Sequence, residues 1–173
     1  MSKFETLPVK EVRQETADCV SIAFDVPVNA TSNFAFKQGQ YITIKTTING
    51  EEIRRSYSIC SSPLDNELRV AVKKVSGGVF STWANEKLKA GAILEVMPPL
   101  GKFYTELDSS SKKQYVAFAS GSGITPILSI IKTTLLTEPL SRFTLVYGNR
   151  NRHSIIFKEA LESLKNKFMG RFS

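Results

Sequence analysis

Residues that ligate metals or form covalent cross-links are scarce in this sequence. Its 173 residues include two cysteines, Cys19 and Cys60, and one histidine, His153. Two cysteines cannot supply the four thiolates of a plant-type iron–sulfur cluster or of a four-cysteine zinc site. A chain of this length buries roughly 70% of its unfolded surface on folding, so its stability requires neither a disulfide nor a metal. We expect no metal site.

Long apolar segments are also missing. No apolar run reaches the roughly 18 residues that a membrane-spanning helix needs, and the first residues lack the apolar core of a signal peptide. Hydrophobic residues make up 42% of the chain and charged residues 23%, an ordinary globular composition that argues against disorder. The sequence therefore predicts a cytoplasmic protein without a membrane partner.

Acidic residues are outnumbered by basic ones. The chain has 23 Lys and Arg against 16 Asp and Glu, which gives a formal net charge of +7. Such a charge favours an anionic partner. The lysines are spread along the whole chain, however, and form no basic stripe of the kind that binds nucleic acid. The charge is compatible with a small anionic ligand and equally with an ordinary solvated surface, and we expect no nucleic-acid partner.

The first hundred residues alternate apolar and polar side chains as β-strands do. Asn49-Gly50, between two such segments, predicts a tight type I′ hairpin turn. Residues 76–88 have helical spacing instead. Together these segments predict a six-stranded antiparallel β-barrel with one capping helix. The expected strands cover residues 9–15, 19–26, 41–47, 53–59, 68–73 and 93–97.

The pattern changes after residue 112. A continuous apolar run over residues 114–119 is typical of a parallel strand that is buried on both faces. A helix, a strand and a second helix follow, which is the start of a doubly wound α/β fold. These three elements are expected at residues 127–136, 143–147 and 155–168.

This pattern predicts two domains of unequal completeness. We expect a β-barrel domain over residues 1–108 and, over residues 113–173, only the N-terminal half of a nucleotide-binding domain. A truncated sheet leaves open strand edges, through which two chains could pair as a homodimer.

A basic and aromatic segment is the most informative part of the predicted barrel. Alternation places Arg55 and Tyr57 on one side of a strand, and Ser56 and Ser58 on the other. An aromatic ring beside a guanidinium at a strand end can stack on a planar ligand and hold its anionic group. The alternative is an ordinary edge strand with an exposed arginine and a half-buried tyrosine.

Two glycines open the predicted helix of the barrel. Gly77 and Gly78 leave backbone N–H groups free for an anion, and the helix dipole adds roughly half a positive charge at this end. The hydroxyls of Ser81 and Thr82 could donate to the same anion. The alternative is an ordinary helix that is capped by Ser76.

A second glycine-rich turn follows the apolar strand of the second domain. Gly121 and Gly123 permit a tight turn and a close approach of a phosphate-bearing ligand. Thr125 is expected as the helix N-cap and Pro126 as the first helical residue. The turn is neither a P-loop nor a nucleophile elbow. His153 is expected on the surface at a helix start, so a hydrolase triad has no support.

Taken in order, these segments resemble the ferredoxin–NADP reductase superfamily. Within it, the sequence is most similar to the reductase components of bacterial multicomponent oxygenases, such as the one that serves phenylacetyl-CoA epoxidation in phenylacetate degradation. The likeness covers essentially the whole chain. It is carried by Arg55-x-Tyr57-Ser58, Gly77-Gly78-x-x-Ser81-Thr82, Pro99-Leu100-Gly101-Lys102-Phe103, Gly121-x-Gly123-x-Thr125-Pro126 and Tyr147-Gly148-Asn149-Arg150.

The resemblance implies a role for each matching residue. Arg55 would pair with the flavin phosphate, Tyr57 would lie against the flavin ring, and Ser58 would hydrogen-bond near the hydride-accepting nitrogen. Tyr57 and Ser58 are thus the implied catalytic residues. The other implied cofactor-binding residues are Ser56, Val72, Lys73, Val75, Gly77, Gly78, Val79, Ser81, Thr82, Gly121, Gly123, Thr125, Pro126, Asn149, Arg150 and Arg152.

The same resemblance indicates which cofactors are bound. A pyrophosphate held at the helix start near Gly78 favours FAD over FMN. No Asp or Glu follows the second predicted strand of the nucleotide-binding domain to bind a ribose hydroxyl. Arg150 and Arg152 stand there instead, which favours NADPH over NADH as the hydride donor.

The implied activity is that of an FAD-dependent NAD(P)H oxidoreductase. Hydride from NADPH or NADH would reach FAD, and single electrons would then pass to an iron–sulfur acceptor. The family's remaining nucleotide-binding strands and its ferredoxin-like domain are missing from this sequence, so we expect FAD binding with poor turnover. The alternative is a basic barrel that binds a partner protein or nucleic acid without flavin.

Overall fold

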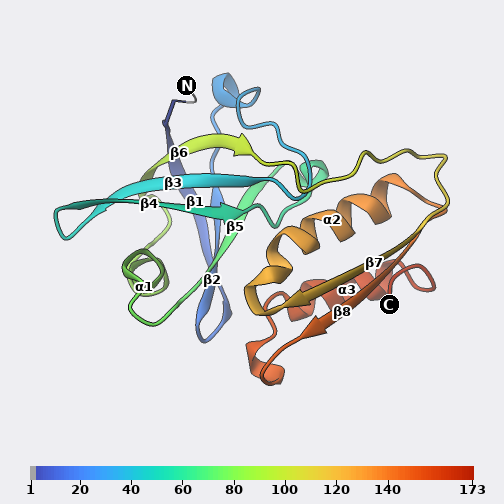
Figure 1. Ribbon diagram of the computed structural model, residues 1–173. Helices are drawn as coiled ribbons and strands as arrows, with labels where there is room; N and C mark the ends of the chain where they lie inside the picture. The colour runs from blue at the N-terminus through green and yellow to red at the C-terminus, as the bar shows by residue number, and fades with distance from the viewer. Residues whose placement is uncertain (1–2) are drawn as a thin grey trace.

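The computed structural model describes residues 3–173, which form two parts that follow each other along the chain (Figure 1). The first part is a six-stranded antiparallel sheet with one helix, and the second is a pair of parallel strands with two helices. The predicted fold class is therefore confirmed. The strands of the first part are β1 (Glu5–Thr16), β2 (Cys19–Phe24), β3 (Tyr41–Ile48), β4 (Glu51–Ser58), β5 (Leu68–Lys73) and β6 (Ile93–Leu100).

The six strands pair in the order β4-β3-β6-β1-β2-β5. A bridge between Ile59 and Val70 joins the two end strands, β4 and β5, and closes the sheet into a barrel. In the β3–β4 hairpin, Asn49 and Gly50 have φ values of +53° and +84°. Two positive φ values in succession are what the predicted type I′ turn requires.

Several strand ends differ from the predicted ones because backbone pairing, rather than side-chain alternation, sets them. β1 begins at Glu5 instead of residue 9, since its first residues pair with β6. β6 likewise extends to Leu100, where it pairs with the start of β3. β2 ends at Phe24 rather than residue 26, and β4 covers Glu51–Ser58 rather than 53–59.

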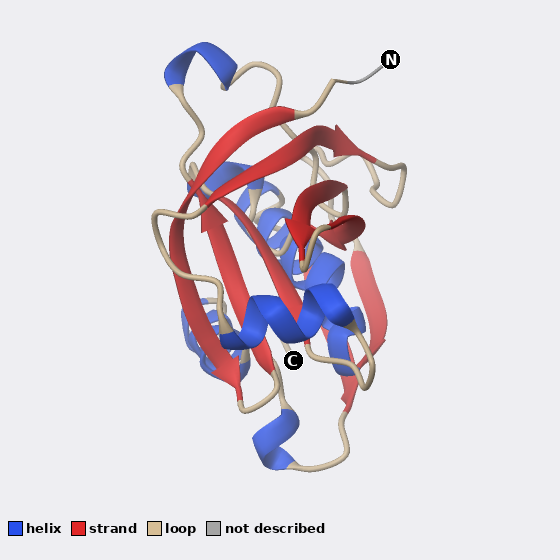
Figure 2. Ribbon diagram, turned by 90° about the vertical axis from the view of Figure 1, so that its left-hand side faces the viewer, coloured by secondary structure: helices blue, strands red, loops and turns tan. Residues whose placement is uncertain are grey.

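Helix α1 (Val79–Glu86) lies across the strands of the barrel (Figure 2). Its Phe80 side chain is buried in the barrel core, with ring centroids 5.4 Å from Tyr57 and 5.7 Å from Trp83. This packing holds the start of α1 beside the end of β4. The helix has Gly78 as its N-cap residue, not Ser76, and no side chain caps it.

The second part pairs its strands in parallel and packs its helices on one face of them. Both helices contribute to a single apolar cluster with the strands, which includes Ile131, Leu164 and Phe143. The elements are β7 (Gln114–Ser120), α2 (Ile124–Thr137), β8 (Arg142–Gly148) and α3 (Lys158–Lys167).

The sequence predicts that strand β7 is buried on both faces, but in the structure one face of the strand is exposed. Val116 and Phe118 are 60% and 76% exposed, and Val146 of β8 is 50% exposed. The reason is that α2 and α3 cover the alternate side chains of both strands, on the other face. Among the described residues β7 pairs with β8 alone, whereas the outer edge of β8 also bridges to Phe172. The expected open edge therefore lies on β7.

The helices of the second part start at other residues than the predicted ones. α2 begins at Ile124, directly after a 3-10 turn over Gly121–Gly123, with Gly123 as its N-cap. Thr125 and Pro126 are therefore its second and third residues. Proline is tolerated there because N–H groups of the first turn have no helical partner. α3 begins only after Phe157, whose φ of +62° interrupts the predicted helix.

Residues 101–113 connect the two parts, and a buried carboxylate anchors their end. Glu138, directly after α2, is fully buried. It accepts hydrogen bonds from the N–H of Asp108 at 3.1 Å and from the hydroxyls of Tyr115 at 3.0 Å and Ser141 at 2.6 Å. The linker is thereby held against the end of α2.

The described part of the chain shows neither a membrane span nor a metal cluster. No helix within residues 3–173 has both the length and the apolar character to cross a membrane. Within the same residues, no group of three or more His, Cys, Asp and Glu side chains is placed to hold a metal ion. Cys19 and Cys60 are both buried as free thiols.

Candidate functional site

A cavity of about 370 Å³ opens where the end of β4, the start of α1 and the turn before α2 meet. Its volume lies at the low end of the range of about 300–1,000 Å³ that is common for small-molecule and cofactor pockets. Arg55 and Gly78, which are distant in the sequence, both line it. The other lining residues are Ser56, Tyr57, Ser58, Ala71, Lys73, Val75, Val79, Phe80, Ser81, Ser122 and Thr125.

This cavity collects most of the predicted barrel residues and adds Thr125 from the second part. Ala71, Phe80 and Ser122 are not among the predicted residues. Ala71 and Lys73 are two residues apart on β5, so their side chains lie on the same face of the strand. The alternation of side chains along β5 could therefore have predicted Ala71 from Lys73. The predicted residues outside the lining are Val72, Gly77, Thr82, Gly121, Gly123, Pro126, Asn149, Arg150 and Arg152.

Val72 faces the barrel core rather than the cavity. Its side chain is fully buried, and its carbonyl oxygen accepts a hydrogen bond from the Asn85 amide at 3.0 Å. The N–H of Lys74 donates to the carbonyl of Asp18 beside β2, at 2.7 Å. The carbonyl of Lys73, in the same peptide unit, therefore points away from β2. Of Val72 and Lys73, only Lys73 lines the cavity.

The charge of Arg55 is not neutralised by a neighbouring carboxylate. Its guanidinium donates to the carbonyl of Arg54 at 2.7 Å, and it takes part in none of the ion pairs between described residues. Arg54 instead pairs with Glu52 at 2.6 Å and lies over the ring of Phe4. Arg55 thus brings a free positive charge to the cavity wall, where a phosphate group can pair with it.

Tyr57 supplies an aromatic surface and a neutral hydroxyl. Its half-buried ring is tilted by 32° against the ring of Phe80. Burial raises the pKa of Tyr57 to about 12, against the smaller opposing effect of the Arg55 charge. The hydroxyl therefore stays protonated at neutral pH, and the ring remains available for packing against a planar ligand.

The start of α1, rather than the loop before it, has free backbone N–H groups, because the N–H of Gly78 donates to the carbonyl of Val75 at 3.0 Å. Gly77 has a φ of +72°, which favours glycine. The first N–H groups of α1 have no partner within the helix, and no acidic residue in its first turn neutralises its positive end. The Ser81 hydroxyl donates to the carbonyl of Gly78 at 3.2 Å, a bond that it would have to give up in order to act as the predicted phosphate donor.

The turn before α2 brings the second part of the chain to the same cavity. Ser122 and Thr125 both line it. The Thr125 hydroxyl donates to the carbonyl of Ser122 at 2.7 Å rather than capping the helix. From the end of β8, the Tyr147 hydroxyl donates to the carbonyl of Gly121 at 2.8 Å. This bond holds the glycine turn at the mouth of the cavity.

Helix α2 is fastened to the barrel segment that follows β4. The Ser129 hydroxyl donates to the carbonyl of Ser61 at 2.6 Å, and the hydroxyls of Ser62 and Thr133 lie 2.9 Å apart. All of these groups are buried. Because the same helix starts at the cavity, these contacts set how the second part faces the barrel residues.

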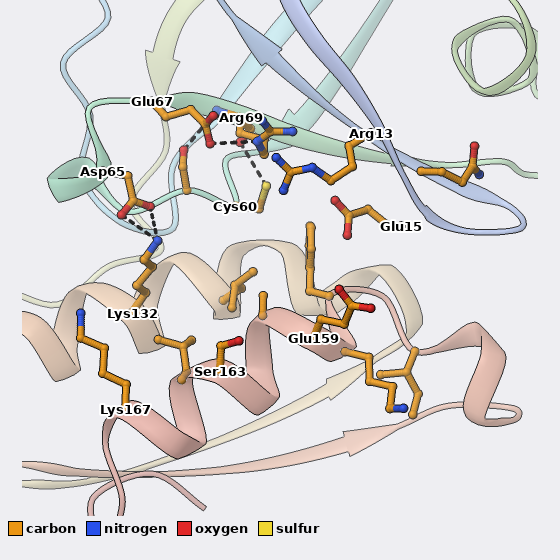
Figure 3. Close-up of a pocket in the computed structure, with 18 of the residues that line it drawn as sticks. Arg13, Glu15, Cys60, Asp65, Glu67, Arg69, Lys132, Glu159, Ser163 and Lys167 are labelled. Atoms are coloured by element: carbon orange, nitrogen blue, oxygen red, sulfur yellow. Dashed lines mark hydrogen bonds and ion pairs between the residues drawn. The ribbon is translucent and has the colours of Figure 1, made fainter.

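A larger cavity, of about 930 Å³, lies between the barrel and α3 (Figure 3). Arg152 lines this cavity and not the one that contains Arg55. Its walls mix both signs of charge, so they indicate no single class of ligand. The charged residues are Arg13, Glu15, Asp65, Glu67, Arg69, Lys132, Arg152, Lys158, Glu159 and Lys167.

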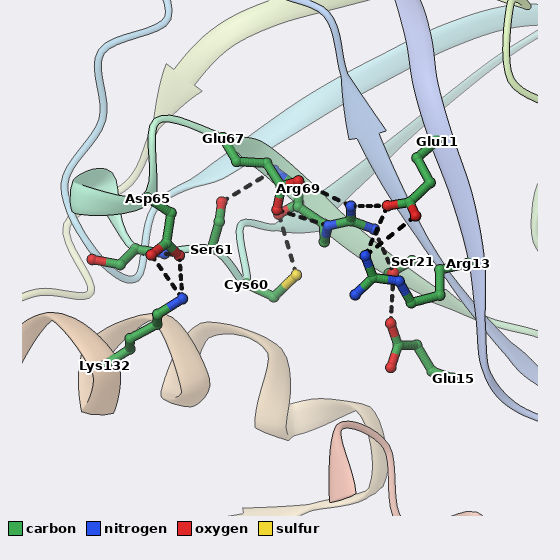
Figure 4. A network of polar contacts seen from close by, with 11 residues as sticks. Glu11, Arg13, Glu15, Ser21, Cys60, Ser61, Asp65, Glu67, Arg69 and Lys132 are labelled. Atoms are coloured by element: carbon green, nitrogen blue, oxygen red, sulfur yellow. Dashed lines mark hydrogen bonds and ion pairs between the residues drawn. The ribbon is translucent and has the colours of Figure 1, made fainter. Parts of the chain in front are cut away.

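The barrel wall of this larger cavity is a structural ion-pair network (Figure 4). The buried guanidinium of Arg69 donates to Glu67 at 2.8 Å and to Ser21 at 2.9 Å, and it also pairs with Glu11. The hydrogen bond from Arg69 holds the pKa of Glu67 below its usual value, against the effect of burial. The network joins β1, β2 and β5 and leaves Arg69 occupied.

Comparison with known families decides between the interpretations of this site. Residues 6–104 match the oxidoreductase FAD-binding domain, and residues 118–173 match the oxidoreductase NAD-binding domain. The chain belongs to the oxidoreductase FAD-binding domain family. The predicted superfamily and the two predicted cofactor classes, FAD and a nicotinamide dinucleotide, are thereby confirmed. The alternative of a flavin-free basic barrel finds no support in these matches.

Relatives with known roles are about twice as long as this chain. It is 48% identical to a component of the 1,2-phenylacetyl-CoA epoxidase of Escherichia coli, over 99% of this chain and 48% of that protein. It is 38% identical to the ferredoxin reductase component of 3-ketosteroid-9-alpha-monooxygenase from Rhodococcus rhodochrous, again over 99% of this chain and 48% of the relative. The chain thus spans about half the length of the curated relatives that it matches.

A solved structure shows the same arrangement of elements. Phthalate dioxygenase reductase, described as a modular structure for electron transfer from pyridine nucleotides to a [2Fe-2S] centre, superimposes with a TM-score of 0.77. The sequence identity is 27%, and the match covers 98% of this chain and 50% of that one. The barrel and the parallel strands therefore follow the fold of phthalate dioxygenase reductase.

Proposed function

We propose that this chain is the flavin-binding half of a reductase that takes a hydride from NADPH and passes electrons to an iron–sulfur acceptor of an oxygenase. The observation that carries the proposal is one cavity shared by Arg55 and Tyr57 of β4, the Gly78 loop, and Thr125 of the second part. Residues 1–108 form the FAD-binding domain in this proposal, and residues 113–173 bind the nicotinamide nucleotide. The reductase names of two matched proteins support it.

The residues around the cavity fit FAD. Arg55 provides a cation without a carboxylate partner, and the N–H groups at the start of α1 provide a second anion site. Two anion sites suit the diphosphate of FAD better than the single phosphate of FMN. Val75 and Val79, which are 56% and 45% exposed, offer with Tyr57 the apolar surface that a flavin ring would cover.

The protein's part in the chemistry is to bind and to orient. FAD, when bound, supplies hydride acceptance and one-electron release, so the reaction requires no side-chain acid or base. Arg55 pairs with the phosphate, Tyr57 packs against the ring, and the Ser58 hydroxyl hydrogen-bonds to the ring edge. Ser122 and Thr125 keep the nicotinamide on the side of the cavity that α2 faces.

The preference for NADPH rests on the residues after β8. Arg150 and Arg152 are both exposed there. Neither takes part in an ion pair between described residues, so both can meet a 2′-phosphate. Action in the cytoplasm belongs to the same proposal and is supported by Cys19 and Cys60, which are buried as free thiols.

Flavin titration tests the proposal directly. Flavin-free protein is titrated with FAD and with FMN while the visible absorption and flavin fluorescence are followed. We expect one FAD to bind per chain, more tightly than FMN. NADPH and NADH are then added without oxygen, and a lower dissociation constant for NADPH is expected. Failure of both flavins to bind would overturn the proposal.

Homodimer formation through the open edge of β7 is a further part of the proposal. It is supported by the single strand neighbour of β7 among the described residues and by its exposed Val116 and Phe118. Sedimentation of the protein over a range of concentrations, with and without Phe118→Lys, measures it. A monomer at every concentration would rule the dimer out.

A further inference from the structure

Ser81 of α1 ties the helix to the loop of residues 74–78. Its hydroxyl oxygen accepts a hydrogen bond from the N–H of Val75 at 3.2 Å, and its hydroxyl donates to the carbonyl of Gly78, also at 3.2 Å. The residue is buried. A serine hydroxyl has a single hydrogen to donate. Because Gly78 receives it, none is left for a phosphate oxygen, which can only accept.

Asn85, one turn later on the same helix, ties Ser81 to the barrel. Its side-chain nitrogen donates to the carbonyl of Ser81 at 2.8 Å and to the carbonyl of Val72 on β5 at 3.0 Å. Both partners are acceptors, so the nitrogen and not the oxygen of the amide must face them. The amide oxygen is buried and has no partner within residues 3–173. Asn85 therefore uses its side chain to join β5 to α1.

The glycine at position 78 is required by the close packing of Ser81 and Val75 and not by its backbone conformation. Gly78 has a φ of −78°, which any residue adopts. A Cβ atom there, however, would lie 2.4 Å from the Ser81 hydroxyl oxygen and 2.5 Å from a methyl of Val75. Gly77 shows the opposite case, because its φ is +72° and a Cβ would meet nothing within 4 Å. The loop is thus built around the buried hydroxyl.

We propose that the Ser81 hydroxyl and the Asn85 side chain are positioning groups, which set the loop of residues 74–78 for the dinucleotide and do not themselves bind it. The inference rests on the proposed function and gives the Ser81 hydroxyl a different role from the predicted one. Its physical content is preorganisation: the loop is held in its binding form before the ligand arrives, so binding does not have to order it. The phosphates are then held by Arg55 and by the N–H groups at the start of α1.

Hydrogen exchange in flavin-free protein tests the inference without the cofactor. Exchange of the Val75 N–H is followed by NMR in the wild type, Ser81→Ala, Asn85→Ala and the double variant. We expect each single variant to speed this exchange by about tenfold, the scale of one lost hydrogen bond. The matched control is Glu86→Gln, which removes the exposed 2.5 Å contact between Glu86 and Lys74 of the same loop. It should leave the exchange unchanged.

FAD affinity provides the second measurement. Ser81→Ala and Asn85→Ala should each weaken FAD binding. The double variant should weaken it by less than the product of the two single effects, because both substitutions disrupt the same hydrogen-bond network. Ser81→Thr, which keeps the hydroxyl, should exchange its Val75 N–H more slowly than Ser81→Ala does. Unchanged exchange of amides in β1 and β2 shows that each variant remains folded.

The outcomes separate the inference from the proposed function. If Ser81→Ala weakens FAD binding while the Val75 N–H of the flavin-free protein exchanges as in the wild type, Ser81 is a direct ligand and the inference is wrong. Additive effects of Ser81→Ala and Asn85→Ala on affinity would also overturn it. If no variant and not even the wild type binds FAD, the proposed function fails, whereas the exchange rates still show whether the two residues hold the loop.

Discussion

The hydroxyl of Tyr147 lies 2.8 Å from the carbonyl oxygen of Gly121 and donates a hydrogen bond to it, so that the end of β8 supports the turn before α2. Gly121 has a φ of +51°, a conformation that costs glycine little. We expect Tyr147→Phe to weaken nicotinamide-nucleotide binding by up to about tenfold, the scale of one lost hydrogen bond. FAD affinity should stay unchanged. Nucleotide titration of FAD-loaded protein measures the effect.

Tyr104→Phe is the matched control for this change. Tyr104 lies in the linker, under the ammonium of Lys37 at 4.7 Å, and does not line the cavity. Its loss of a hydroxyl should leave both affinities at the wild-type level. An equal loss of FAD and nucleotide affinity in Tyr147→Phe would show that the bond serves the whole fold rather than the turn.

Arg55 and Arg54 are adjacent in the sequence, but we expect their substitution to change FAD affinity to different extents. Arg55→Ala should weaken FAD binding by about 1.5–3 kcal/mol, the contribution of a charge-assisted hydrogen bond. Arg54→Ala should cost less than about 1 kcal/mol, because Arg54 forms an exposed pair with Glu52 on the surface. Dissociation constants from fluorescence titration give both values. Equal losses in the two variants would place the phosphate elsewhere.

Glu138 makes stability depend on pH. Burial raises its pKa, but hydrogen bonds from Ser141, Asp108 and Tyr115 outweigh this and hold the pKa below its usual value. A group of this kind stabilises the fold above its unfolded pKa of about 4.3, and the contribution is lost as the pH falls through the folded pKa. Glu138→Gln should therefore be less stable than the wild type at neutral pH, with a difference that shrinks in acid.

Urea unfolding at neutral pH and at several acid pH values measures this difference. Glu159→Gln, a change at an exposed position of α3, is the control and should follow the wild type throughout. A difference between wild type and Glu138→Gln that stays constant down to the lowest pH would mean that the charge of Glu138 is not what stabilises the linker.

Two contacts between α2 and the barrel should differ in strength. Ser129→Ala leaves the buried carbonyl of Ser61 without its 2.6 Å partner, which costs about 1–3 kcal/mol. Lys132→Ala breaks a 2.7 Å pair with Asp65 whose side chains are 35% and 20% exposed. Such a partly exposed pair contributes about 0.2–1 kcal/mol. Free energies of unfolding in urea rank the two variants, and the reverse order would contradict the burial argument.

Both thiols should be inert in the folded protein. Burial raises the pKa of Cys19 to about 12 and that of Cys60 still further, so almost no thiolate is present at neutral pH. Ellman's reagent should react with both cysteines in urea and with neither in buffer. Cys60 is the more demanding case, because it lines the larger cavity, through which the reagent could approach it. Rapid release of one equivalent of chromophore from native protein would contradict the prediction.

Much of the fold and of the candidate site follows from local sequence. The hairpin at Asn49 and Gly50 forms as predicted, because only a few residue types accept positive φ at two successive positions. The resemblance to the ferredoxin–NADP reductase superfamily implies that Arg55 and Gly78 hold the same diphosphate, and both residues line one cavity. The family match confirms the class of cofactor.

Other features depend on contacts between distant residues. Ser81 reads locally as a phosphate donor, but Gly78 takes its only hydrogen. The run over residues 114–119 reads as a strand buried on both faces, yet Phe118 is exposed because both helices pack on the opposite face. Nothing local predicts that Glu138 anchors the linker.

The sequence by itself therefore determined the order and type of the elements and the turn chemistry, because these follow from the side chains and backbone preferences of neighbouring residues. Its resemblance to a known superfamily indicated the class of ligand. Only the tertiary structure decided which polar groups remain free for that ligand. A hydroxyl or a carboxylate forms only a limited number of hydrogen bonds. Whether Ser81 and Glu138 form theirs with other protein groups depends on which groups the fold places within hydrogen-bond distance.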